Sequence, residues 1–198
     1  ELWAGVTARQ PDVTLALLAH AVRSGADAAV IAPLSIAGLS ESDILPFFQR
    51  SVREVLETAG RMIPVFLYDN ADIAADPKVP HLRTALVKRL SRLGFVRGVK
   101  VSAPMPVLGN YAKAAHHFHA RGAFGIYTGN ARLVFEIFDT DKGPFRRYLD
   151  RFLLNASLPI GVVAGQANAF PREWQDAWRV SVAGDDREIA RYRGAFEA

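Results

Sequence analysis

Lys100 has the residue type and the setting that indicate covalent chemistry. It follows Gly98 and Val99 within an apolar run and precedes Val101. Lysine is seldom buried without a reason, and apolar surroundings favour the neutral amine, which is the form that attacks a carbonyl. The alternative is a lysine at a strand end that extends its ammonium group to solvent or pairs with a carboxylate. The local pattern alone leaves both interpretations open.

Tyr68 is the second candidate, because it ends an apolar run that starts at Ile63. A ring at that position can pack on the core while its hydroxyl faces the rim, where a phenol can pass a proton to a reacting oxygen. The alternative is a tyrosine at a rim whose hydroxyl binds the backbone.

Six apolar runs alternate with amphipathic segments along the chain, and we predict that these runs are strands. They cover residues 2–6, 28–32, 63–68, 95–101, 123–127 and 158–164. Ser40 and Asp43 form a near capping box that predicts the start of a helix, and Gly60 ends that pattern. Strict alternation of strands and helices indicates a parallel α/β architecture, and short apolar strands are typical of a sheet covered on both faces.

The predicted fold class is α/β, of the TIM (β/α)8 barrel type. The chain has no GxGxxG after its first apolar run and no GxxxxGK[ST], so a nucleotide-binding sheet loses support. A closed barrel needs eight units in about 250 residues, whereas about six units are recognisable here. We therefore expect residues 1–198 to form a single domain, a partial barrel whose first two units are missing, with a helical extension from about residue 172.

The carboxyl ends of the strands are where a parallel barrel carries its functional groups. Neighbouring strands lie about 4.8 Å apart, so Tyr68 and Lys100 converge only if both point inward, and a one-residue difference in register would turn one outward. Six other residues near these ends are candidates for substrate binding: Ser35, Asp69, Thr128, Gly129, Asn130 and Gly165.

Composition and charge exclude several classes of protein. Half of the 198 residues are hydrophobic and none is cysteine, which excludes a disordered chain, a disulfide scaffold and a thiol nucleophile. No apolar run approaches the roughly 18 residues that cross a bilayer, and a net charge of +4 is too small an excess to predict nucleic-acid binding. We expect neither a membrane nor a nucleic acid as partner, and a cytoplasmic location.

Three histidines, His116, His117 and His119, fall within one predicted helix, Tyr111–Ala120. The first and the last have the i, i+3 spacing of a metal-binding pair, but no carboxylate lies near them in the sequence. We interpret them as solvated histidines near a helix C-terminus, where positive charge is favourable, and predict no metal site.

Four segments resemble the dihydrodipicolinate synthase and N-acetylneuraminate lyase family, in consistent order along nearly the whole chain. Gly25–Pro33 is similar to the family's fourth-strand signature, and Tyr68-Asp69-Asn70 lies where the family has a Tyr-Asn-x-Pro turn. Gly98-Val99-Lys100 is similar to the Schiff-base segment, and residues 161–171 are similar to the eighth-strand motif.

The resemblance implies a class I aldolase-type barrel in which Lys100 condenses with the keto group of pyruvate or another 2-oxo acid while Tyr68 relays protons. It implies a lyase or aldolase without a metal or organic cofactor. It further implies an aldehyde or sugar acid as the second small-molecule partner, and a homo-oligomer, either a dimer or a tetramer.

The departures from the family narrow this expectation. The family's first two strands, with their carboxylate-holding hydroxyl pair, have no counterpart, and Leu34-Ser35 stand where many synthases have paired tyrosines. Asp69 replaces an asparagine, and residues 139–155 resemble an insertion. A sugar-acid aldolase or dehydratase therefore fits better than a dihydrodipicolinate synthase. The alternative is a non-catalytic barrel relative that binds a small acid or a protein partner.

Overall fold

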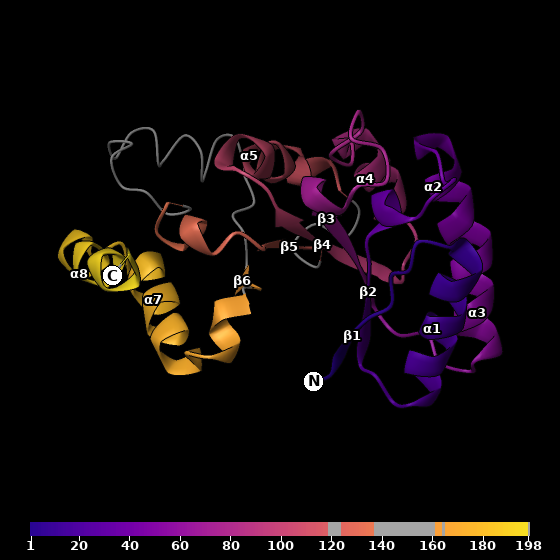
Figure 1. The fold of residues 1–198 in the computed structure, drawn as a ribbon, viewed down its shortest axis with the longest axis horizontal. Helices are drawn as coiled ribbons and strands as arrows, with labels where there is room; N and C mark the ends of the chain where they lie inside the picture. Colours follow the sequence, from indigo (N-terminus) through magenta and orange to yellow (C-terminus); the bar gives the residue numbers. More distant parts are fainter. Residues whose placement is uncertain (119–123, 137–160, 164, 198) are drawn as a thin grey trace. The chain divides into compact units, whose positions relative to one another are not determined.

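A computed structural model describes residues 1–118, 124–136, 161–163 and 165–197 (Figure 1). The chain divides into two compact units. The first comprises residues 1–102 and 117–125, and the second comprises residues 103–116 and the described residues from 126 onward. Within the described ranges, no helix is both long enough and apolar enough to span a membrane.

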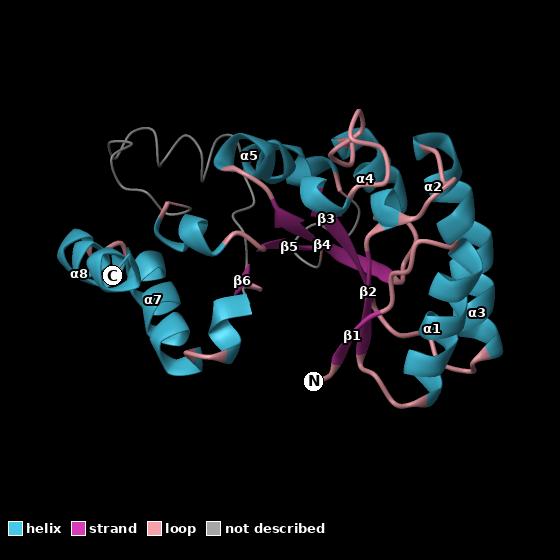
Figure 2. Ribbon diagram, viewed as in Figure 1, coloured by secondary structure: helices cyan, strands magenta, loops and turns pink. Residues whose placement is uncertain are grey.

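The first unit is a parallel sheet with helices beside it (Figure 2). Its strands are β1 (Trp3–Gly5), β2 (Ala28–Ile31), β3 (Val65–Asn70) and β4 (Val96–Ser102). Its helices are α1 (Pro11–Arg23), α2 (Glu41–Phe47), the π-helix η2 (Phe48–Val52), α3 (Arg53–Thr58) and α4 (Thr84–Leu90), with 3₁₀ turns η1 (Pro33–Ser35) and η3 (Ala71–Ile73). Each strand pairs in parallel with the next one along the chain.

A row of fully buried residues on β2, β3 and β4 forms part of the core of this unit. Ile31 is the register partner of Leu67, and Leu67 is the register partner of Val99. Buried helix residues such as Leu18 and Phe48 supply the other apolar surface. Because strand residues alternate between faces, the residues on either side of this row along each strand belong to the opposite face of the sheet.

The second unit has its own apolar cluster. Its elements are α5 (Met105–Ala114), η5 (Ala131–Phe135), β6 (Gly161–Val162), η7 (Gly165–Asn168), α7 (Pro171–Ala183) and α8 (Asp186–Glu197). The turn η4 (Ala115–His117) and the strand β5 (Gly125–Thr128) span the boundaries between the units in the sequence. β5 pairs in parallel with β6. Buried Phe135, Trp174 and Ile189 join η5, α7 and α8.

All six predicted strands are present, and the order of the strands follows the chain within each unit. Two helices differ from the prediction. α5 begins at Met105 rather than at Tyr111, because Pro104 at its N-cap and Pro106 in its first turn suit a helix start. The helix that begins after Ser40 contains the π-helical turn η2 shortly after Pro46, which has no N–H to donate to the helix.

Candidate active site

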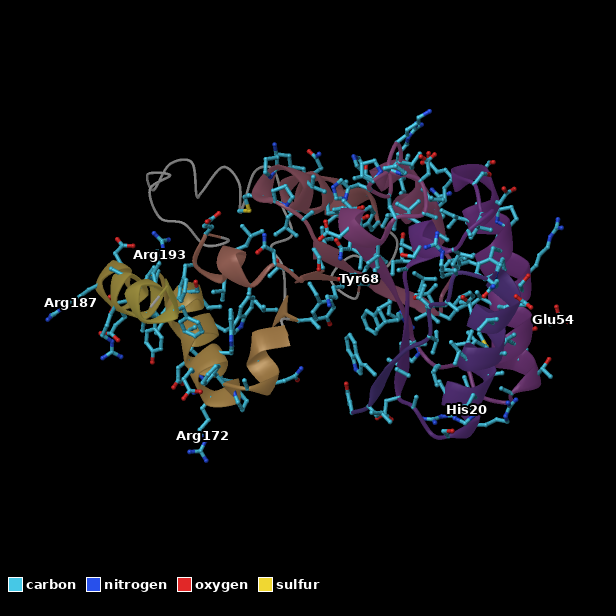
Figure 3. The ribbon with its side chains drawn as sticks, in the orientation of Figure 1. His20, Glu54, Tyr68, Arg172, Arg187 and Arg193 are labelled. Carbon is cyan, nitrogen blue, oxygen red and sulfur yellow. The ribbon has the colours of Figure 1, made fainter. Side chains whose placement is uncertain are left out.

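Tyr68 and Lys100 are register partners across β3 and β4. Both side chains are half-buried and lie on the same face of the sheet, with Tyr68 marked in Figure 3. The Lys100 Nζ atom lies 4.4 Å from the centroid of the Tyr68 ring. The negative face of the ring attracts an ammonium group at this distance, with a free energy of about 0.5–1 kcal/mol at a partly exposed site. The ring therefore helps to hold the amine beside the phenol.

The Tyr68 hydroxyl is held by two polar side chains near the carboxyl ends of the strands. Ser102 Oγ lies 3.1 Å from it, and Asn70 Nδ2 donates to it at 3.1 Å. The alternation of strand residues gives the reason, because Asn70 is two residues beyond Tyr68 and Ser102 is two residues beyond Lys100. These four residues form a polar cluster on one face of β3 and β4, which we call the β3–β4 cluster.

An aromatic layer lies on the same face, toward the amino ends of the strands. Phe66 is the register partner of Gly98, and its ring stacks on Trp3 with the centroids 4.1 Å apart. A Cβ atom at Gly98 would lie 2.8 Å from the Phe66 ring and 2.5 Å from the carbonyl oxygen of Gly125. Glycine at position 98 therefore leaves the space that this ring occupies, two residues before Lys100.

Asp69 points away from the β3–β4 cluster. Its side chain is fully buried, its carboxylate accepts a hydrogen bond from the Leu82 backbone N–H at 3.2 Å, and His81 Nδ1 lies 3.1 Å from it. Asp69 thus anchors the segment that leads into α4. The sequence interpretation placed it with the substrate-binding residues, but its position between Tyr68 and Asn70 assigns it to the opposite face of the strand.

Ser35 ends the turn η1 that follows β2. Its Oγ atom is buried and has no hydrogen-bond partner among the described residues. Thr14 is a useful contrast, because its buried hydroxyl accepts from the Ala8 N–H at 2.9 Å and donates to the Ala8 carbonyl at 3.1 Å. Among the described residues, the Ser35 hydroxyl therefore has no role in holding the fold, whereas the Thr14 hydroxyl holds the Ala8 backbone.

This contrast gives a prediction about stability. Ser35→Ala is expected to leave the free energy of unfolding unchanged or to raise it slightly, because it removes an unpaired buried hydroxyl. Thr14→Val is expected to lower it by about 1–3 kcal/mol, because it leaves the part-buried Ala8 N–H without its acceptor. Urea denaturation of the two variants measures both values. A loss of more than about 1 kcal/mol in Ser35→Ala would show that its hydroxyl has a partner within the protein.

The remaining substrate-binding candidates, Thr128, Gly129, Asn130 and Gly165, belong to the second unit. Thr128 is fully buried at the end of β5, and its hydroxyl accepts from the Asn130 backbone N–H at 3.3 Å. Gly129 lies between these two residues, and Gly165 begins η7 after β6. The hydrogen bond between Thr128 and Asn130 stabilises the turn that follows β5.

Other predicted features fall partly outside the described residues. His119, the side chain of His116 and the 139–155 segment belong to this category. Within the part of the chain that the structure describes, no group of three or more His, Asp or Glu side chains could hold a metal ion.

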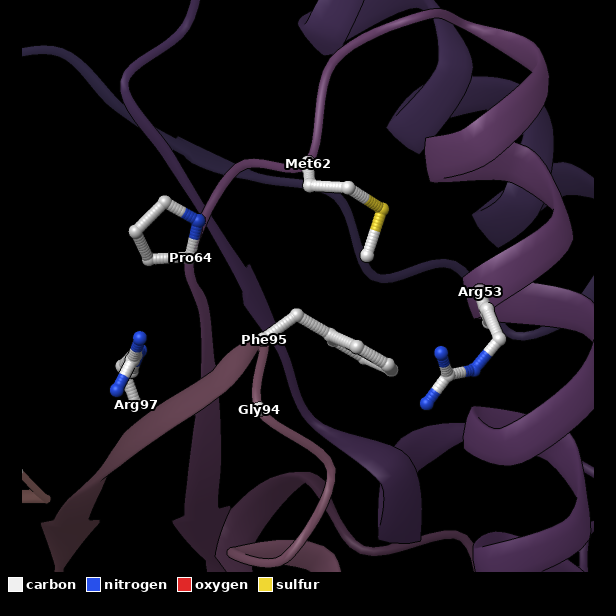
Figure 4. A pocket seen from close by; sticks show the side chains of 6 residues that line it. All are labelled: Arg53, Met62, Pro64, Gly94, Phe95 and Arg97. Atoms are coloured by element: carbon white, nitrogen blue, oxygen red, sulfur yellow. The ribbon is translucent and has the colours of Figure 1, made fainter. Parts of the chain in front are cut away.

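A pocket of about 300 Å³ lies at the amino ends of β3 and β4 (Figure 4). Its lining residues are Arg53, Met62, Pro64, Gly94, Phe95 and Arg97. The Arg53 guanidinium group lies 5.4 Å from the centroid of the Phe95 ring. Because Tyr68, Asn70, Lys100 and Ser102 lie toward the carboxyl ends of the same strands, this pocket is separate from the β3–β4 cluster.

Comparison with known proteins defines the class of fold. No protein-family model matches the chain, and no curated protein matches it. Solved structures do match, and they show that the chain has the parallel α/β, barrel-type fold of the dihydrodipicolinate synthase family, at sequence identities of 15–23%. The resemblance inferred from the sequence is confirmed at the level of the fold.

Three of these structures illustrate the likeness. The chain is similar to dihydrodipicolinate synthase from Bacteroides thetaiotaomicron, with a TM-score of 0.74 and 19% identity, over 98% of this chain and 56% of that one. It is similar to YagE of E. coli K12, a member of the same family in complex with pyruvate, with a TM-score of 0.69 and 19% identity over 97% and 55%. It is also similar to KD(P)GA from T. tenax, with a TM-score of 0.65 and 23% identity over 98% and 57%. The chain thus spans little more than half the length of these proteins.

Proposed function

We propose that this chain is part of a divergent lyase or aldolase that acts on a 2-oxo acid through a Schiff base on Lys100. The observation that carries the proposal is the register pairing of Lys100 with Tyr68, which puts the amine 4.4 Å from the centroid of the phenol ring. The fold supports it, and so does the pyruvate complex of YagE, one of the structures that share this fold.

The chemistry follows from an amine and a phenol on one face of the sheet. The Lys100 amine attacks the 2-oxo carbon, and the carbinolamine oxygen leaves as water after it receives a proton from the Tyr68 hydroxyl. The Tyr68 phenolate then takes the proton of the C4 hydroxyl, the electron pair of the C3–C4 bond moves to the iminium group, and an aldehyde departs while an enamine remains. Protonation of the enamine at C3 and hydrolysis of the imine then release the 2-oxo acid and regenerate Lys100.

A hydroxylated sugar acid is the substrate class that we propose, in preference to the reaction of a dihydrodipicolinate synthase. Ser35 offers an unpaired hydroxyl, and Ser102 and Asn70 add hydrogen-bonding groups near Tyr68. Such groups suit a substrate that carries several hydroxyls, because each can act as donor or acceptor. The same groups suit a dehydratase, in which the iminium group loses a proton from C3 and the resulting enamine expels the hydroxyl at C4, which leaves as water.

Reductive trapping tests the proposal. Incubation of the full protein with pyruvate and borohydride is expected to add one reduced pyruvyl group at Lys100, as shown by intact-mass analysis and peptide mapping. Lys100→Arg is expected to abolish the adduct, because a guanidinium group does not condense with ketones under these conditions. The control Lys88→Arg, on α4, should leave adduct formation unchanged. If several 2-oxo acids leave Lys100 unmodified, the non-catalytic relative that binds a small acid or a protein partner becomes the better interpretation.

A further inference from the structure

We propose that Asn70 is a positioning residue that fixes the direction of the Tyr68 hydroxyl. Its amide donates to the phenol oxygen, so the hydroxyl proton is directed away from Asn70, toward Ser102 or a bound substrate. This inference rests on the proposed function for its catalytic consequence. The hydrogen bonds themselves, from Asp72 to Asn70, from Asn70 to Tyr68 and between Tyr68 and Ser102, can be tested without any reaction.

The orientation of the Asn70 amide is set by a backbone group. Asn70 Oδ1 accepts from the Asp72 backbone N–H at 3.1 Å. A backbone N–H can only donate, so the end of the amide that faces Asp72 must be the oxygen. The other end is therefore the NH₂ group, and it lies 3.1 Å from the Tyr68 hydroxyl. An NH₂ group of an amide donates only, which makes the phenol oxygen the acceptor in this contact.

The direction of the hydroxyl proton follows from this assignment. With Asn70 as donor, the Tyr68 proton has to point elsewhere, and Ser102 Oγ at 3.1 Å is the side-chain acceptor available to it among the described residues. A substrate oxygen beside the Lys100 amine could take the place of Ser102. The amide of Asn70 also stabilises the negative charge that grows on the phenol oxygen when the proton leaves.

The isosteric change Asn70→Asp separates this role from a structural one. A carboxylate keeps an oxygen for the Asp72 N–H, so the turn η3 retains its cap. The carboxylate has no N–H to donate, and it accepts strongly. The Tyr68 hydroxyl is therefore expected to donate to residue 70 in this variant, which reverses the hydrogen bond and turns the proton away from Ser102. Asn110→Asp on α5, where Asn110 is exposed, provides the same chemical change as a control.

The first measurement is the ¹³C NMR signal of the ring carbon that bears the Tyr68 hydroxyl, assigned by its loss in Tyr68→Phe. It is expected to shift in Asn70→Asp and to stay in place in Asn110→Asp. The second measurement is the rate of borohydride-trapped adduct formation with pyruvate. Asn70→Asp is expected to lower this rate by about 10-fold, a part of what a general acid–base group contributes. It should cause no further loss when Tyr68 is already Phe, because the two residues act as one unit.

The two measurements distinguish the failure of this inference from the failure of the proposed function. An unchanged Tyr68 signal in Asn70→Asp overturns the inference, whether or not the protein reacts with pyruvate. An equal loss of rate in the Tyr68→Phe background also overturns it, because Asn70 would then act by a route that avoids the hydroxyl. If the unmodified protein forms no adduct but the signal shifts as expected, the hydrogen-bond assignment holds and the proposed reaction fails.

Discussion

Tyr68→Phe is expected to slow the turnover of a 2-oxo acid substrate by about 100-fold or more, as the loss of a general acid–base group should. The variant keeps the ring beside the Lys100 amine and removes only the hydroxyl that contacts Ser102 and Asn70. Its free energy of unfolding should fall by about 1 kcal/mol at most, because these hydrogen bonds are only partly buried. Steady-state kinetics and urea denaturation provide the two values.

Tyr192→Phe on α8 is the matched control, since it removes a phenol hydroxyl that lies in the second unit. It should leave turnover unchanged. Undiminished activity in Tyr68→Phe would remove Tyr68 from the mechanism and leave Lys100 without its proposed proton donor.

Gly98→Ala is expected to lower the free energy of unfolding by about 3 kcal/mol, at the upper end of the range for overpacking a core. The added methyl group would lie 2.5 Å from the Gly125 carbonyl oxygen and 2.8 Å from the Phe66 ring. The carbonyl belongs to the backbone, and the ring is stacked on Trp3. Neither neighbour can move without disturbing packed structure. Chemical denaturation measures the loss.

Gly94→Ala is the control for this substitution, because a Cβ atom there meets nothing within 4 Å. It precedes the same strand and should change stability by less than about 0.5 kcal/mol. If Gly98→Ala were as stable as Gly94→Ala, Phe66 would have to be free to leave the space above Gly98.

Much of the fold was predictable, because apolar runs and glycine stops are local signals. The strands β1 to β4 lie within two residues of their expected bounds, and the box of Ser40 and Asp43 does begin α2, with Asp43 accepting from the Ser40 N–H at 3.2 Å. The start of α5 was less predictable. The helix was expected from Tyr111, and the start signal of Pro104 and Pro106 was not used, although proline is favoured in the first turn of a helix.

Sequence alone predicted those residues of the candidate site whose type and position in a strand are enough to suggest a role. Lys100 and Tyr68 stand at strand ends, so their types alone single them out. Ser102 was missed, because its contact with Tyr68, 34 positions away, depends on the register of two strands. Asn70 was noted at the strand end but not placed in the site, although its contact with Tyr68 spans only two residues and follows from the alternation along β3. Asp69 was grouped with the site because it is polar and lies at a strand end. Strict alternation along β3 would have assigned it to the helix-covered face, where it binds Leu82.

The register pairing of Tyr68 and Lys100 has a consequence for how such a protein can diversify. The two side chains project from backbone positions that are fixed by the ladder between β3 and β4. Their separation is therefore insulated from the length and composition of the connecting segments, such as η1 after β2 and residues 71–83 after β3. Changes there can alter which substrate is accepted while the reacting pair stays unchanged. An engineer who wishes to change the substrate would therefore keep the sequences of β3 and β4 and randomise the connecting segments.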